Sequence, residues 1–344
     1  MLTLQHQPDK RQRYDALRPF RFDESLDCLC VFDANLIEAV FRSDKFDVIS
    51  FGDQYRYIRE QTSLDFGPTI TAFDHIPLAN EGEQHKQTRS NIAAVVGQES
   101  REKTKLMEEF VAEHTRRLFI AGNEIELAED FAKPIFLRLF SLWLGVDHNN
   151  LVDDPNFSQV FDMKMSLNRR KRINRNVGNL TCAFQQLHER LPTTPEFATA
   201  MNILGNDALK GSMSLSLWEL LAHNPGVRLD RIEYPRSMPS TGVPFIERVA
   251  REDVEINGMK VPGGRRVRLY LDATTYNISG QENDVLFGKG KHVCLGKPMS
   301  LAIWRCLAAT LGSLPLHFTL GEMKLRSADY AFNCLEYGRL KIHD

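Results

Sequence analysis

Leu286-Phe287-Gly288-Lys289-Gly290-Lys291-His292-Val293-Cys294-Leu295-Gly296 is the stretch that decides the fold, and it lies directly before a predicted helix. The two glycines before the cysteine permit a tight, irregular loop, and Gly296 lets backbone or a flat ligand approach closely. Amides at the start of a helix favour a thiolate over a thiol. Such a thiolate can ligate iron, and as an axial ligand of heme it favours O–O cleavage. The alternative is a buried structural cysteine in a glycine-rich turn.

This loop resembles the heme-binding signature of the cytochrome P450 family: Phe, two residues, Gly, three residues, Cys, one residue, Gly. Phe287, Gly290, Cys294 and Gly296 fill every fixed position, and His292 is also typical of the family. The resemblance implies a heme-thiolate protein with heme b (iron-protoporphyrin IX) as cofactor. Cys294 would be the iron ligand, Phe287 would pack against the sulfur side of the macrocycle, and His292 would help to hold a propionate.

A second resemblance lies in His85-Lys86-Gln87-Thr88-Arg89, on a predicted helix. Residues four apart share one helical face, so His85 and Arg89 can reach the same ligand. In the family such a pair meets the heme propionates, and a carboxylate gains from guanidinium and imidazole donors. Arg248 matches the family's propionate-binding arginine before its small sheet. The alternatives are a solvated helix face for the pair and a surface strand for Arg248.

The longest predicted helix carries a partial match to the family's distal motif, in Leu204-Gly205-Asn206-Asp207-Ala208-Leu209. The family normally has a small residue, Gly, any residue, an acid and Thr; glycine opens a gap over the iron, and the acid and alcohol deliver protons to dioxygen. Gly205 and Asp207 match, so the resemblance places them with Ala208 in the catalytic region. Because Ala208 has no hydroxyl to donate, proton delivery must use Asp207, water, the substrate or Ser212, or it is not needed. The alternative for Asp207 is an exposed helix acid.

The interval between Asn224-Pro225 and Cys294 departs most from the family. The family has further helices here, then a Glu-x-x-Arg helix, a small sheet and a meander, whereas this interval is much shorter. Glu233-Tyr234-Pro235-Arg236 has the Glu-x-x-Arg spacing, but a helix tolerates proline only in its first turn. Whether Glu233 and Arg236 pair therefore stays open. The segment 276–285 resembles a shortened meander.

Apolar residues recur at helical spacing through most of the chain. We expect a short strand in 27–33 and then helices in 35–46, from Glu83, from Ser100 (N-cap) to Gly122, in 130–146, in 195–226 and after Gly296. A further helix after Phe157 is expected to be interrupted by the basic run 169–175. After Pro225 the pattern alternates, and Asn257-Gly258 and Gly263-Gly264 are hairpin signals. The tail after Leu316 is expected to form short strands.

The fold class that follows is mainly α with a small β region: a cytochrome P450-like fold, compacted between the long central helix and the cysteine loop. Residues 1–20 are predicted to be a loosely ordered lead-in, and residues 21–344 a single domain. With 42% hydrophobic and 26% charged residues, disordered, fibrous and small disulfide-stapled classes are excluded. The formal charge of −2 argues against nucleic acid, and no apolar run suits a membrane. Six cysteines, with no signal peptide, favour a cytoplasmic protein.

Four cations, Lys289, Lys291, Lys297 and Arg305, surround the cysteine loop and could form a basic face for an acidic ferredoxin or reductase; ordinary surface positions are the alternative. The run 169–175 is expected to be solvated, with a partner-binding patch as the less favoured interpretation. Met163, Met165, Met201 and Met213 are expected to fill core or pocket. The substrate should border Phe66–His75, Asn202–Gly205 and Pro244–Phe245.

The favoured function is a heme-dependent monooxygenase that oxidises a small organic molecule, with specialised metabolite biosynthesis as one setting. Its oxygen activation would be atypical because Ala208 replaces the usual threonine. Peroxide use, substrate-assisted proton delivery or an iron-bound rearrangement would suit the missing alcohol. Two alternatives belong to other classes. One is a heme-dependent binding or sensing protein without oxygen activation, and the other is a non-redox step such as a cyclisation or dehydration.

Overall fold

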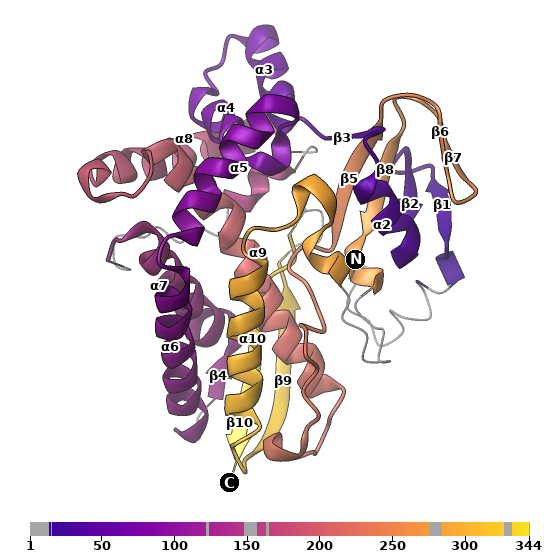
Figure 1. The fold of residues 1–344 in the computed structure, drawn as a ribbon. Coiled ribbons are helices and arrows are strands. Elements are labelled where there is room, and N and C mark those ends of the chain that lie inside the picture. The colour runs from indigo at the N-terminus through magenta and orange to yellow at the C-terminus, as the bar shows by residue number, and fades with distance from the viewer. Residues whose placement is uncertain are drawn as a thin grey trace.

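The computed structural model describes residues 14, 16–121, 124–147, 157–162, 165–274, 284–326 and 332–343. It has a large helical part and a smaller β-rich part beside it (Figure 1). The helices are α2 (Ala34–Arg42), α3 (Phe51–Thr62), α4 (Gly67–Asp74), α5 (Gly82–Gly97), α6 (Ser100–Ile120), α7 (Lys133–Leu144), α8 (Leu167–Gln185), α9 (Pro195–Ala222) and α10 (Lys297–Leu311). The expected class, mainly α with a small β region, is confirmed.

Three sheets complete the fold of the described residues. The largest has the order β1-β2-β8-β5-β3, formed by Phe20–Asp23, Cys28–Val31, Arg266–Tyr270, Phe245–Ala250 and Phe46–Val48. Only β2 and β8 pair in parallel among the described strands, with Leu29 opposite Val267. A second sheet has the order β4-β10-β9, from Glu124–Glu126, Leu335–His343 and His317–Leu325, and β6 (Val254–Ile256) pairs with β7 (Met259–Val261). The largest sheet brings the start of the chain beside the segment before the cysteine loop.

The two glycine pairs behave differently. Asn257 and Gly258, both with positive φ, form the predicted hairpin turn between β6 and β7. The turn at Gly263-Gly264 joins β7 to β8, which lie in different sheets, so the second hairpin prediction is wrong. The turn is held instead by the Gly264 amide, which donates to the carbonyl of Ala250.

Helix α9 passes through the middle of the helical part, where α7 and α8 pack on it, while α10 packs on α6 (Figure 1). Most of its side chains are buried, including Leu215, Leu217 and Leu221. A helix that is apolar on nearly every side is stable only when neighbours surround it. This explains why the two internal glycines are tolerated: packing, rather than helix propensity, stabilises α9.

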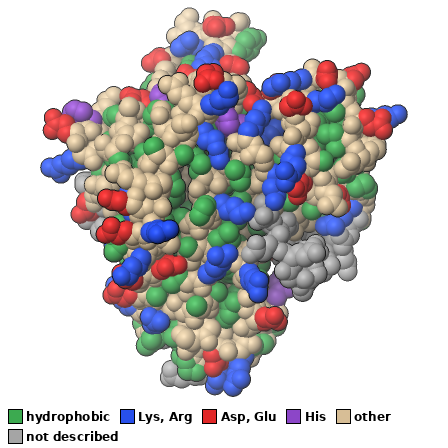
Figure 2. All heavy atoms as spheres, in the orientation of Figure 1, with side chains coloured by type: hydrophobic (Ala, Val, Ile, Leu, Met, Phe, Trp, Pro, Cys, Tyr) green, Lys and Arg blue, Asp and Glu red, His purple; other side chains and the backbone are tan. Residues whose placement is uncertain are grey.

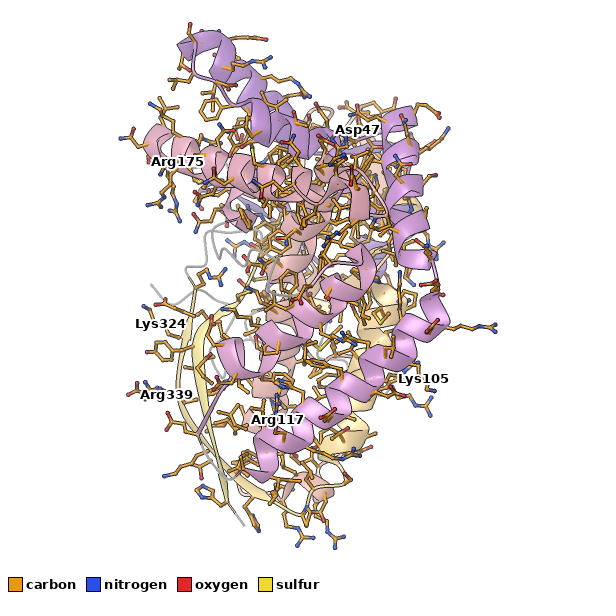
Figure 3. All side chains as sticks on the ribbon, turned by 90° about the vertical axis from the view of Figure 1, so that its left-hand side faces the viewer. Asp47, Lys105, Arg117, Arg175, Lys324 and Arg339 are labelled. Carbon is orange, nitrogen blue, oxygen red and sulfur yellow. The ribbon has the colours of Figure 1, made fainter. Side chains whose placement is uncertain are left out.

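The predicted interruption of a helix by the basic run is wrong, because residues 169–175 lie in the first turns of α8. Arg170 is buried and its guanidinium lies 5.0 Å from the ring centroid of Tyr55, whereas Arg175 lies on the outer side of α8 (Figure 3). The Ser100 N-cap prediction is also wrong by one residue, because Glu99 takes that place with a left-handed backbone. Gly122 lies outside the described residues.

Of the lead-in, the structure describes residue 14 and residues 16–20. Tyr14 is buried, with its ring 5.6 Å from that of Phe32 and 6.0 Å from that of Tyr270. The strand β1 begins at Phe20, the last residue of the predicted lead-in, and the division into lead-in and domain stays a prediction. Residues 1–13 and 15, the meander-like segment as far as residue 283 and Met163 lie outside the described residues.

The shortened interval after α9 contains a short 3-10 turn, Leu229–Arg231, and otherwise irregular chain as far as β5. Glu233 and Arg236 lie outside any helix, in this irregular chain. Within the described chain no ion pair joins them, so the structure does not form the Glu-x-x-Arg pair. Pro235 instead accepts a hydrogen bond at its carbonyl from Trp304 Nε1, at 2.9 Å. The proline that breaks the motif thus anchors the interval to α10.

The same interval then crosses α9 backbone to backbone. At Gly211 the interval and the segment before β10 both meet α9: a Cβ there would lie 3.0 Å from the Cα of Gly242 and 1.9 Å from the Asn333 carbonyl oxygen. The Gly242 amide donates to Ser212 Oγ at 2.8 Å, and Ser216 Oγ both accepts from the Ser240 amide and donates to its carbonyl. Serines one turn apart on α9 therefore hold the crossing segment in place.

Candidate functional site

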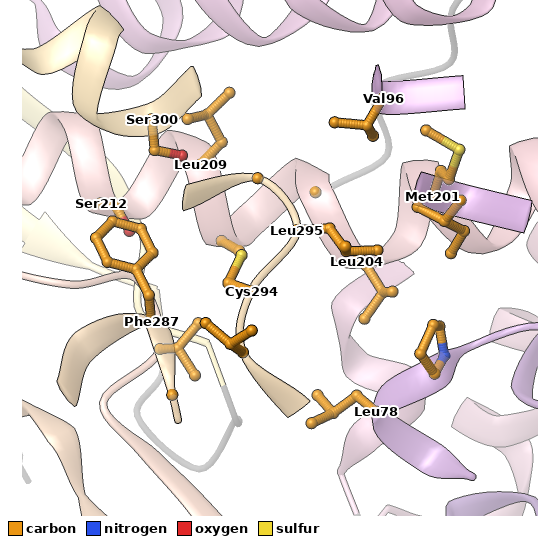
Figure 4. A pocket seen from close by; sticks show the side chains of 18 of the residues that line it. Leu78, Val96, Met201, Leu204, Leu209, Ser212, Phe287, Cys294, Leu295 and Ser300 are labelled. Carbon is orange, nitrogen blue, oxygen red and sulfur yellow. The ribbon is translucent and has the colours of Figure 1, made fainter. Parts of the chain in front are cut away.

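A cavity opens between α5, α7, α9 and the cysteine loop, with about 1370 Å³ of space between side chains when its open mouth is included. Figure 4 shows Cys294 inside it, with Leu204, Leu295 and Phe287 around the sulfur. Most of the lining is apolar; it includes Leu78, Ile92, Val96, Leu139, Trp143, Met201, Met238, Val243, Ile246 and Phe332. A large apolar hollow with a few polar groups is the usual form of a cofactor or ligand site.

The cysteine loop is shaped by its glycines and by one short backbone bond. Gly288 and Gly290 have φ of 69° and 64°, which other residues rarely adopt. A Cβ on Gly290 would also lie 2.9 Å from the Phe41 carbonyl oxygen. The Cys294 amide donates to the Phe287 carbonyl at 2.7 Å. These contacts close the loop directly before α10, as the sequence predicts.

Cys294 lines the cavity, and its side chain is exposed to the open space there. Burial raises the pKa of the Cys294 thiol, while the Gly296 and Lys297 amides and the charge of Arg89 act in the opposite direction. A Cβ on Gly296 would lie 3.7 Å from the sulfur, so the glycine keeps that side of it open. A cation bound at the sulfur would favour the thiolate further.

The four predicted propionate ligands gather around His292, at the edge of the cavity. The rings of His85 and His292 lie 4.2 Å apart, and Arg89 and His292 both line the cavity. His85 is buried, and its Nε2 has no hydrogen-bond partner in the described structure. Burial lowers the pKa of His85 and that of Arg89, so an anion beside them would compensate their desolvation.

Arg248, the fourth predicted propionate ligand, gives the strongest indication of a bound anion. It is 4% exposed, donates to the Glu247 carbonyl at 2.9 Å and lies 5.4 Å from the ring centroid of Phe41. No carboxylate among the described residues lies within ion-pair distance, and burial lowers the pKa of Arg248 to about 10. A buried guanidinium without a carboxylate is costly. A ligand with carboxylates at this end of the cavity would compensate it.

Glu81 is a site residue that sequence reasoning missed. Its carboxylate accepts from the Val48 amide at 3.1 Å, pairs with Lys291, and lies 3.2 Å from His292 Nε2. The signal available in the sequence was an acid four residues before His85, at the start of the same helix. The Lys291 charge that we assigned to a partner-binding face therefore forms an ion pair within the molecule, although the side chain is 43% exposed.

One face of α9 forms the opposite wall. Leu204, Gly205, Ala208 and Ser212 all line the cavity, as expected for residues three or four apart. A Cβ on Gly205 would lie 2.2 Å from Phe140 Cζ. The glycine thus makes room for an aromatic ring from α7, in addition to bordering the cavity.

Asp207 is not among the residues that line the cavity. Its Oδ2 accepts from Arg326 at 2.8 Å, its Oδ1 lies 3.9 Å from Lys210 Nζ, and its side chain is 3% exposed. It is therefore not the exposed acid of the alternative interpretation. A role in proton delivery stays a prediction, and the observed contacts give the carboxylate a structural partner.

The expected substrate borders are met in part. Leu204 and Gly205 line the cavity, and so do Val243 and Ile246 on either side of Pro244–Phe245. The segment Phe66–His75 contributes no lining residue, because Phe66 and Phe73 are buried in the core of the helical part. Met201 lines the cavity, whereas Met165 and Met213 are buried core residues. The lining residues just before α5 were missed because the irregular chain there gave no periodic signal.

Several Lys and Arg side chains gather on the face that holds the cysteine loop and α10 (Figure 2). Lys297 Nζ lies 5.9 Å from the Phe287 ring, and Arg305 is exposed.

Among the helices of the described residues, none is both long and apolar enough to span a bilayer.

The residues of the cavity fit an iron porphyrin with two carboxylates. Cys294 offers a sulfur ligand within an apolar hollow, and His85 and Arg248 are buried polar groups that lack an anionic partner among the described residues. Arg89 and His292 line the cavity near the same two residues. One thiolate, one apolar space and one cationic end are the features that such a group requires.

The fold has many relatives among solved structures, although no family model and no curated protein sequence matches the chain. P450BioI, solved in complex with an acyl carrier protein ligated to hexadec-9Z-enoic acid, has a TM-score of 0.74 at 19% identity, with 97% of each chain covered. CalO2 has a TM-score of 0.76 at 16% identity over 97% of each chain. CYP109B1 from Bacillus subtilis has a TM-score of 0.71 at 17% identity, over 98% of this chain and 100% of that one. The similarity extends over almost the whole molecule.

Proposed function

Because this chain has the cytochrome P450 fold, we propose that it is a heme-thiolate enzyme that oxidises a small, uncharged, apolar molecule. The observation that carries the proposal is the position of Cys294, with its sulfur facing an apolar cavity that Arg89 and His292 also line. His85 and Arg248 are buried beside His292. A structural cysteine would need neither the cavity nor the uncompensated cations.

The chain's own residues have separate tasks. Cys294 would hold the iron, with Phe287 beside it, while Gly290 and Gly296 shape the loop. His85, Arg89, His292 and Arg248 would bind the two propionates and so fix the orientation of the macrocycle. Heme b, when bound, supplies redox chemistry at an iron made electron-rich by the thiolate.

The substrate class follows from the lining. Side chains from η1 (Pro77–Ala79), α5, α9 and the crossing segment 238–246 are mostly aliphatic, and Ser212, Thr241 and Ser300 are small polar groups among them. The charged or basic side chains on the described lining are Arg89 and His292, which are assigned to the propionates. Since an unpaired charge in an apolar site is strongly disfavoured, a neutral, apolar substrate suits the remaining space.

The face of α9 argues for an unusual supply of protons. Ala208 has no hydroxyl, and Asp207 is paired with Arg326 away from the lining. Ser212 Oγ already accepts from the Gly242 amide, although its own hydroxyl proton can still be donated. Chemistry that needs no relay therefore suits this site: use of peroxide as oxidant, or protons supplied by the substrate.

A second candidate is a heme protein of this fold that performs a non-redox step or binds a ligand without oxygen activation. The same apolar wall, Leu204 and Ala208, favours it, because neither side chain can donate a proton. Specialised metabolism as the setting, and a ferredoxin or reductase as partner at Lys289 and Lys297, remain predictions.

The test is reconstitution of the purified protein with heme, followed by reduction and addition of carbon monoxide. We expect the strongly red-shifted Soret band of thiolate ligation, and its loss in Cys294→Ala but not in Cys182→Ala, whose cysteine is also exposed. Apolar candidate substrates are then assayed in two ways, with dioxygen plus a reducing system and with peroxide. Oxidised product in either assay supports the oxidising enzyme, and no oxidised product in both supports the second candidate. A protein that takes up no heme would refute both.

A further inference from the structure

Glu81 joins three parts of the molecule through one carboxylate. Its Oε1 accepts from the Val48 amide at the end of β3 and lies 3.2 Å from His292 Nε2, and its Oε2 pairs with Lys291. Glu81 is itself the N-cap residue of α5, four residues before His85. The cysteine loop, the β-rich part and the helix of His85 and Arg89 thus meet at this side chain.

The position of Glu81 at a helix start has a simpler interpretation, which the contacts do not support. An acid there can cap the helix or stabilise its positive end. The Glu81 side chain makes no capping hydrogen bond to α5. It turns away to the loop, and its 21% exposure means that water screens these contacts only in part.

The charges around Glu81 do not cancel. Lys291, Arg89 and Arg248 contribute three positive charges, and Glu81 contributes one negative charge that pairs with Lys291. Two cations, Arg89 and Arg248, are left without a carboxylate in the described part of the chain. Two carboxylates of one bound porphyrin would neutralise them.

We propose that Glu81 is a positioning residue that fixes the cysteine loop before any cofactor binds. Because its carboxylate pairs with Lys291, it leaves the two positive charges of Arg89 and Arg248 for the two carboxylates of a porphyrin. This inference rests on the proposed function for its second half only. Its first half concerns the heme-free protein and is decided without heme.

The first experiment is limited trypsin digestion of the heme-free protein, with cleavage sites identified by mass spectrometry. Lys289 and Lys291 are cleavage sites inside the loop, and Lys105 on α6 is an internal reference. We expect Glu81→Ala to raise cleavage at the two loop sites at least roughly tenfold, because it removes the charge-assisted hydrogen bonds that hold the loop, and to leave cleavage at Lys105 unchanged. Glu81→Asp should restore part of the protection.

Glu83→Gln is the matched control, because Glu83 lies on the same helix, is exposed and pairs only with Lys86 in the described structure. It removes the same charge and should leave loop cleavage at the wild-type rate. Far-UV circular dichroism of each variant shows that it is folded. Equal loop cleavage in wild type, Glu81→Ala and Glu83→Gln would overturn the proposal, and so would an equal rise in both variants.

The second experiment uses heme-loaded protein and two readouts that are independent of turnover. Heme loss to an excess of apomyoglobin should be faster in Glu81→Ala than in Glu83→Gln. The reduced carbon monoxide complex of Glu81→Ala should show less of the thiolate band. If neither the wild type nor any variant binds heme, the proposed function fails. The digestion of the heme-free protein still decides the role of Glu81 in that case. If heme binds and Glu81→Ala matches the control in both readouts, the positioning role fails and the function stands.

Discussion

Replacing Arg248 by methionine should have opposite effects on the heme-free and the heme-loaded protein. In the heme-free structure Arg248 is 4% exposed and has no carboxylate within ion-pair distance among the described residues. Methionine is unbranched and carries no charge, so it can fill much of the same space without the desolvation cost. Replacing a buried ion by an apolar side chain of similar volume is often stabilising.

The structure sets the magnitude. Burial lowers the pKa of Arg248 to about 10, and since a tenfold change in proton affinity is worth about 1.4 kcal/mol, the cost to the charged form is about 3 kcal/mol. The Phe41 ring and the Glu247 carbonyl recover part of this, by about 1 kcal/mol each at most. We therefore expect Arg248→Met to raise the unfolding free energy of the heme-free protein by about 1–3 kcal/mol. It should also weaken heme retention by about 1.5–3 kcal/mol, because methionine cannot make a charge-assisted hydrogen bond to a propionate.

The assay is urea unfolding of both forms, followed by circular dichroism, together with the rate of heme transfer to apomyoglobin. Arg175→Met is the control, because Arg175 is exposed on α8 and its replacement should change stability by less than about 0.5 kcal/mol. A decrease in stability of similar size in both forms of Arg248→Met would mean that the arginine is structural. The assignment of this end of the cavity to carboxylates would then be refuted.

Three other variants test separate parts of the site. In His85→Ala/Arg89→Ala, heme retention should fall by about 1.5–3 kcal/mol for each propionate hydrogen bond removed; unchanged heme occupancy and unfolding midpoint would count against the pair. Gly211→Ala should lower the unfolding free energy by about 2–4 kcal/mol, because its methyl group would lie 1.9 Å from the Asn333 oxygen. This overpacking outweighs the gain of about 1 kcal/mol in helix propensity. Gly97→Ala is the control: a Cβ there has nothing within 4 Å, so the change should be neutral or stabilising. Asp207→Asn should cost about 2–3 kcal/mol in urea unfolding because the buried pair with Arg326 is broken; unchanged stability with abolished turnover would instead assign the carboxylate to proton delivery.

The parts of the site that sequence reasoning predicted are those with local signals. The cysteine loop and α10 are set by glycines with positive φ and by a helix start, and both lie where expected. His85 and Arg89 follow from a spacing of four on one helix. Each of these inferences needs only residues that are near one another in the chain.

The direction in which the Asp207 side chain points could not be predicted in this way. Its partner, Arg326, directly follows β9, far along the chain, and helical spacing alone cannot tell which face of a buried helix meets which neighbour. Glu81 was missed for the same reason, since Val48 and His292 come from other segments. Electrostatic partners of long sequence separation are properties of the packed structure.

The shortened interval shows how tertiary packing can replace a missing element. The family resemblance implies a Glu-x-x-Arg helix before the small sheet, and the chain has none in the described interval. The Pro235 carbonyl and the Trp304 indole instead tie the interval to α10, and Ser212 and Ser216 tie it to α9. Because Gly211 and Gly242 let the backbones meet closely, Val243 reaches the cavity wall, and Ile246 follows on β5. The cavity is therefore closed on this side by extended chain rather than by helices, and its shape there depends on glycine and serine contacts that a sequence motif does not record.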